Sequence, residues 1–114
     1  MEKFILLFRG SSVYQPGTSP DALQALKEKM FRWLAELSER GSHVGSEPFE
    51  TTGKLVSGAA KNVKDHPFGN AGEIVGGCTI VQARGFNEAL EIAKSCPILE
   101  TNATIEVRPI QQMA

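Results

Sequence analysis

A carboxylate and an imidazole lie next to each other in the segment Asp65-His66-Pro67-Phe68, directly before the strongest strand pattern of the chain. Histidine titrates near neutral pH, so His66 could relay a proton while Asp65 serves as the base. Neighbouring side chains of an extended segment point to opposite faces, which disfavours a hydrogen bond between these two. In the alternative interpretation Asp65 caps a turn, Pro67 fixes the backbone and Phe68 fills the core. The sequence leaves both interpretations open.

The only other histidine, His43, follows a predicted helix end and starts a strand that should border a ligand cleft. It either faces His66 across the sheet or is a partly exposed residue at a strand end. Two histidines without suitably spaced carboxylates or cysteines do not supply the three or four ligands of a metal site. We therefore predict no metal and no cofactor. The glycine-rich stretch 72–77 enters a strand instead of opening a helix, which argues against a phosphate loop.

Four charged residues lie on or beside predicted strands: Arg9, Glu47, Glu106 and Arg108. Such charges need partners, because burying an isolated charge is costly. They could line a polar pocket that binds a carboxylate or phenolate, or form a structural ion-pair network at a dimer interface. The candidate residues are thus Asp65 and His66 for catalysis and, for binding, His43, Arg9, Glu47, Phe68 and Arg108.

The chain has 114 residues, of which 41% are hydrophobic, and its 12 basic and 13 acidic residues give a formal charge of -1. This length predicts one domain over residues 1–114. The balanced charge argues against nucleic acid or a membrane surface as a partner. The apolar run Phe4–Phe8 is too short for a signal peptide or a membrane span, so we expect a soluble, cytoplasmic protein. Cys78 and Cys96 lack the spacing of a zinc site and are predicted to be buried thiols.

Hydrophobic periodicity and end signals predict two helices. The first has an N-cap, a proline and an acid in Ser19-Pro20-Asp21, and its apolar stripe continues to a stop at Arg40-Gly41. The second begins at Gly85 with Glu88 at its third position and ends at Cys96-Pro97. The predicted strands are Lys3–Arg9, His43–Phe49, Lys54–Ser57, Asn62–Lys64, Ile74–Arg84 and Ala103–Ile110.

The order of these elements is the split βαβ pattern of an α+β, ferredoxin-like sandwich, with Lys54–Ser57 and Asn62–Lys64 as a hairpin insert on a sheet edge. Gly76-Gly77 in the long strand predicts a bulge or a close backbone approach. Both helices should cover one sheet face. The first strand is apolar on its other face too, so we expect a second sheet to cover it in a homodimer.

Several sequence blocks resemble the YCII-related, or DGPF-domain, proteins, in order and over nearly the whole chain: MEKFILLFRG, GSEPFETTGKLVSG, DHPF, EIVGGCTIVQARGFNEALEIAKSCPIL and ATIEVRPI. The resemblance implies a ferredoxin-like dimeric α+β barrel, in which two sheets face each other around a cleft for a small molecule. Asp65 matches the aspartate of the DGPF motif, and His66 replaces the glycine after it. The histidine proposed to act on the first helix of short members has no counterpart in LQALKEKMFRWLAEL.

Two functions follow from the residues and the resemblance. The favoured one is a non-catalytic module that binds a small ligand or serves as an accessory or regulatory partner, since the first-helix histidine is absent. The alternative is a cofactor-free enzyme of the lyase or dehydrochlorinase type, acting on a small, aromatic molecule. In that enzyme Asp65 would be the base, and His66 or His43 would relay the proton.

Overall fold

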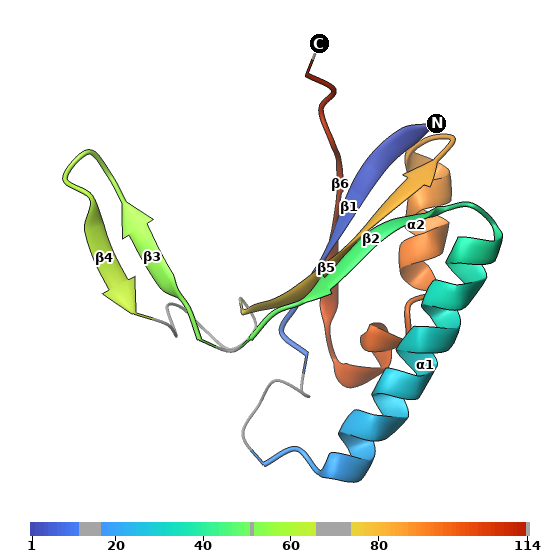
Figure 1. The fold of residues 1–114 in the computed structure, drawn as a ribbon, viewed down its shortest axis with the longest axis horizontal. Coiled ribbons are helices and arrows are strands. Elements are labelled where there is room, and N and C mark those ends of the chain that lie inside the picture. Colours follow the sequence, from blue (N-terminus) through green and yellow to red (C-terminus); the bar gives the residue numbers. More distant parts are fainter. Residues whose placement is uncertain (12–16, 51, 66–73, 114) are drawn as a thin grey trace.

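The computed structural model describes residues 1–11, 17–50, 52–65 and 74–113 of the 114-residue chain. Its elements follow the predicted order and add a short 3-10 helix before the last strand (Figure 1). They are β1 (Glu2–Arg9), α1 (Pro20–Glu39), β2 (His43–Pro48), β3 (Lys54–Ser57), β4 (Asn62–Asp65), β5 (Val75–Ala83), α2 (Phe86–Lys94), η3 (Pro97–Thr101) and β6 (Thr104–Pro109).

Four strands form one antiparallel sheet in the order β2-β5-β1-β6, and α1 and α2 lie together on one side of it (Figure 1). This arrangement confirms the expected α+β, ferredoxin-like fold. Alternate residues of β1 point toward the helices, and the buried ones are Phe4, Leu6 and Phe8. The core lies between this sheet face and the helices, which leaves the opposite sheet face without a helix in the described part of the chain.

The ends of α1 follow the sequence signals. Ser19 Oγ accepts a hydrogen bond from the backbone N–H of Ala22 at 3.1 Å, and Pro20 occupies the first helical position. The apolar stripe buries Trp33 and Leu37 against the sheet. The helix ends before Gly41, which has a positive φ of 73°. Helices often end at a residue in this conformation, and glycine adopts it with little strain.

The paired glycines of β5 give both predicted features. Phe8 pairs with Gly77 and Arg9 pairs with Val75, so Gly76 is the extra residue of a bulge. A Cβ atom on Gly77 would lie 2.9 Å from the carbonyl oxygen of Glu47. Only glycine therefore lets β2 approach β5 this closely.

The hairpin insert forms a two-stranded sheet of its own, in which β3 pairs with β4. The prediction that these strands lie at the edge of the main sheet was therefore wrong. The last contact before the hairpin is the hydrogen bond from the Phe49 N–H to the Gly76 carbonyl, after which the chain leaves the main sheet. All eight hairpin strand residues are exposed, and the hairpin extends away from the main sheet (Figure 1). We call residues 54–65 the arm.

Candidate functional site

The sheet face without helices carries the half-buried side chains of β1 and β5. Ile5, Leu7 and Arg9 alternate with the core residues of β1, and Cys78 and Ile80 lie beside them on β5. We call this surface the open face. Its apolar centre makes it a candidate surface for a ligand or a second chain.

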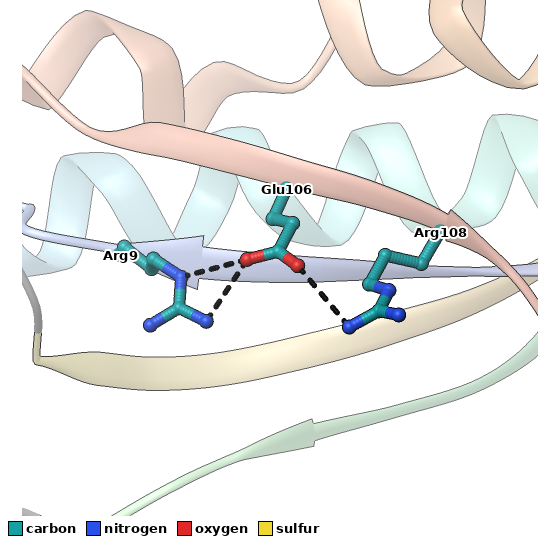
Figure 2. Close-up of polar contacts among 3 residues, drawn as sticks. All are labelled: Arg9, Glu106 and Arg108. Carbon is teal, nitrogen blue, oxygen red and sulfur yellow. Dashed lines mark hydrogen bonds and ion pairs between the residues drawn. The ribbon is translucent and has the colours of Figure 1, made fainter.

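Three charged side chains gather at the β1–β6 side of the open face (Figure 2). Arg9 donates to Glu106 Oε1 from Nε at 3.2 Å and from Nη2 at 2.9 Å. Arg108 Nη1 lies 3.7 Å from Glu106 Oε2, an ion pair longer than a hydrogen bond. Strand register explains the grouping: Glu106 pairs with Leu7 and Arg108 with Ile5. All three side chains therefore belong to one face.

The cluster of Arg9, Glu106 and Arg108 has two positive charges for one negative charge. The side chains of Arg9 and Glu106 are about one third exposed, whereas that of Arg108 is 68% exposed. Glu106 thus holds Arg9 by direct hydrogen bonds and Arg108 only by charge. The guanidinium of Arg108 is the group placed to donate to a carboxylate or phenolate.

Glu47, the fourth predicted charge, also lies on the open face but at its opposite edge. Strand register places Glu47, Cys78, Leu7 and Glu106 in one row across the four strands. Three strand spacings of about 4.8 Å separate the ends of this row by roughly 14 Å. The structure therefore does not bring Glu47 to the arginine cluster, and apolar side chains lie between them.

His43 lies on the helix-covered side of the sheet, not on the open face. It pairs with the core residue Val81, and its Nε2 is 3.1 Å from Ser46 Oγ. Ser46 Oγ in turn lies 2.8 Å from the hydroxyl of Thr79, which is buried. These two hydroxyls were not predicted from the sequence, because their contact depends on the pairing of β2 with β5. The arrangement satisfies the polar groups of the sheet edge.

Asp65 ends strand β4 of the arm, next to the predicted turn. Its Oδ1 accepts a hydrogen bond from Lys54 Nζ at 2.6 Å, and its side chain is 77% exposed. The two residues pair directly across β3 and β4. His66 and Phe68 lie outside the described residues. Within the described chain, Asp65 and His43 belong to different sheets and do not form an acid/base pair (Figure 1).

The two cysteines have different surroundings, although both thiols are free. Cys96 is buried, as predicted, and burial raises its pKa to about 12. Cys78 is only half-buried because its side of β5 is the open face, so the prediction of a buried thiol was wrong for it.

The described residues contain no group of three or more histidine, cysteine or acidic side chains that could hold a metal ion. None of the helices they form is both long and apolar enough to cross a membrane.

Comparisons with known proteins agree with the family resemblance. The family model described as YCII-related domain matches residues 8–114. A comparison with curated protein sequences finds no significant match. Among solved structures, the chain is similar to 5-chloro-2-hydroxyhydroquinone dehydrochlorinase (TftG) from Burkholderia phenoliruptrix AC1100 in complex with 2,5-dihydroxybenzoquinone. The TM-score is 0.54 at 12% identity, over 96% of this chain and 95% of that chain, which shows a common fold.

Proposed function

We propose, from the premise that this chain belongs to the YCII-related domain family, that two copies of it bind a small anionic molecule at the open face and perform no chemistry on it. The observation that supports this function is the cluster of Arg9, Glu106 and Arg108, with its excess of one positive charge. Beside it, Ile5 and Leu7 provide an apolar surface. A ligand with a flat apolar body and one carboxylate or phenolate fits this combination.

A homodimer is part of the proposal, because a second copy would turn the open face into one wall of a cleft. Ile5, Leu7 and Ile80 stay half-buried in a single copy. Two sheets packed face to face lie about 10 Å apart, which would bury these side chains and leave room for a ligand near the charged edges. We also propose a cytoplasmic location, which is supported by two cysteines that remain free thiols.

The placement of Asp65 and His43 favours binding over catalysis. A general base needs a water-poor site, whereas Asp65 is well exposed and already paired with Lys54. His43 lies on the other side of the sheet and contacts Ser46. Among the described residues, the open face carries arginines and carboxylates but no histidine to relay a proton.

Replacing Arg108 tests the binding site. The probe is 2,5-dihydroxybenzoquinone, the ligand of the TftG complex, whose acidic hydroxyl groups ionise to an anion. We expect Arg108→Gln to weaken its binding about 10-fold or more in isothermal titration, because a charge-assisted contact of about 1.5–3 kcal/mol is lost. Arg32→Gln removes the same charge from the exposed surface of α1 and should leave the affinity unchanged. Equal affinities for all three proteins would contradict the proposed site.

The enzyme alternative is tested with 5-chloro-2-hydroxyhydroquinone, the compound in the name of TftG. Chloride release is measured with the wild-type protein and with Asp65→Asn. We expect no release above the uncatalysed background from either protein. Release by the wild-type protein that disappears in Asp65→Asn, with unchanged thermal unfolding, would overturn the non-catalytic proposal and establish Asp65 as a base.

A further inference from the structure

We propose that the arm contacts a second copy of this chain and packs Val56 and Val63 against it. The inference rests on the homodimer of the proposed function and adds a contact that a face-to-face pair of sheets does not require. It starts from the register of the hairpin, in which Val56 pairs with Val63 and Lys54 with Asp65. These four residues share one face, so the arm has an apolar patch beside an ion pair.

The apolar patch has no cover within the described chain. Val56 is 65% exposed and Val63 is 59% exposed, although valine favours half-buried sheet positions. An isolated two-stranded hairpin is marginally stable in water, since few apolar contacts offset the entropy of ordering it. The Lys54–Asp65 ion pair adds little to the stability of the hairpin, because both side chains are exposed. A packing partner would supply the missing burial.

The accessible surface of the chain is larger than that of a compact monomer of the same mass. Its accessible surface is 7843 Å², whereas the scaling for compact monomers predicts about 6,100 Å² for 12.4 kDa. The excess of about 1,700 Å² is larger than the roughly 800 Å² that each partner buries in a standard interface. The radius of gyration is likewise 15.4 Å, against about 13 Å for a compact domain of this length.

The position of the arm favours a second copy of the chain as the partner. Figure 1 shows the arm extending to the opposite side of the main sheet from α1 and α2, which is the side of the open face. A second copy seated on the open face would therefore lie beside the arm. Two-fold symmetry would then place each arm along the other copy, so that the same pair of contacts forms twice.

Charge supports the same partner. Beyond the Lys54–Asp65 pair, the arm carries Lys61 and Lys64 and is therefore positive. The exposed Glu47 at the β2 edge of the open face offers a negative counterpart on the second copy. Steering between these charges would favour this pairing.

The test compares two substitutions that add one negative charge at neighbouring positions of the arm. Val63→Asp changes the apolar face, and Asn62→Asp changes the opposite face. Sedimentation measures the dimer dissociation constant, and amide hydrogen exchange measures protection of the arm. We expect Val63→Asp to raise the dissociation constant at least 10-fold and to abolish protection of the arm. Asn62→Asp should change neither, and protection of α1 should persist in both variants.

Two results would overturn the inference and separate its failure from that of the proposed function. If the wild-type protein dimerises while arm amides exchange as in an unfolded peptide, and Val63→Asp dimerises equally well, the arm contact is wrong and the face-to-face dimer stands. If the wild-type protein stays monomeric at high concentration, the arm inference and the dimer of the proposed function both fail.

Discussion

Glu106 organises the charged part of the open face, because its two carboxylate oxygens lie toward two different arginines. Arg9 donates to Oε1, whereas Arg108 is held at 3.7 Å from Oε2 (Figure 2). The ion pair with Arg108 contributes little to stability, because the Arg108 side chain is well exposed. Its value here is orientation: Glu106 fixes the position of Arg108 without neutralising both guanidinium groups.

Glu88 shows a local electrostatic effect at the start of α2. Its carboxylate accepts hydrogen bonds from the backbone N–H of Arg84 at 3.0 Å and from the Arg84 guanidinium at 2.7 Å. These contacts, the backbone one first, lower the pKa of Glu88 from its ordinary value of 4.5. A lowered folded-state pKa stabilises the fold above the unfolded-state pKa, and this stabilisation is lost as the pH falls through the folded-state pKa.

We therefore expect Glu88→Gln to unfold at lower urea concentration than the wild-type protein at pH 7, with the difference shrinking as the pH falls below 4.5. The measurement is urea unfolding over that pH range. Glu91→Gln removes a carboxylate from the exposed face of the same helix and serves as the control, with a smaller loss at pH 7. A Glu88→Gln deficit that stayed constant down to the lowest pH would show that the Arg84 contacts do not carry the effect.

The sequence predicted the role of single residues where that role depends only on the alternation of side chains along a strand. Arg9, Glu106 and Arg108 were predicted as strand charges that need partners, and the structure places them together. Which of them pair depends on the register between β1 and β6, which alternation does not supply. His43 was expected near a cleft, but its contact with Ser46 on the covered side depends on the bulge between His43 and Gly45.

A side-chain hydrogen bond joins α1 to the residue that caps the end of α2. Trp33 Nε1 of α1 donates to Ser95 Oγ, just after α2, at 2.9 Å. Trp33 is buried, so its N–H has little access to water. A buried donor without an acceptor costs about 1–3 kcal/mol.

We expect Ser95→Ala to lower the free energy of unfolding by about 1–2 kcal/mol, because it removes the acceptor of Trp33 Nε1. Chemical denaturation followed by tryptophan fluorescence measures the change. Ser38→Ala removes an exposed hydroxyl from α1 and should change stability by less than about 0.5 kcal/mol. Equal stabilities of Ser95→Ala and Ser38→Ala would mean that this link between the helices contributes nothing.

Element ends were predictable where local chemistry determines them, as at the Ser19 cap of α1 and at Glu88 in α2. The 3-10 helix Pro97–Thr101 was not expected, since its five residues carry no periodic apolar pattern. The arm was predicted as a hairpin but not as a separate sheet. Its strands are too short and mixed to indicate what they pack against, so only the tertiary structure defines their place.

At the scale of the whole molecule, the fold separates a sheet face that the helices cover from a sheet face that carries no helix in the described part of the chain. The sequence already indicated apolar residues on both faces of β1. The row of residues from Glu47 to Glu106 could not be predicted from the sequence. It depends on the registers of three strand pairs, β2–β5, β5–β1 and β1–β6. The open face therefore has an apolar centre, an acidic residue at each edge, and two arginines beside Glu106.

The most direct test of the central claim is a methyl NMR spectrum of the isoleucine and leucine side chains during titration with 2,5-dihydroxybenzoquinone. We predict shifts at Ile5, Leu7 and Ile80 on the open face, and none at Leu37 and Ile92 in the helix-covered core. Shifts confined to the helices, or a spectrum that does not change at saturating ligand, would contradict binding at the open face.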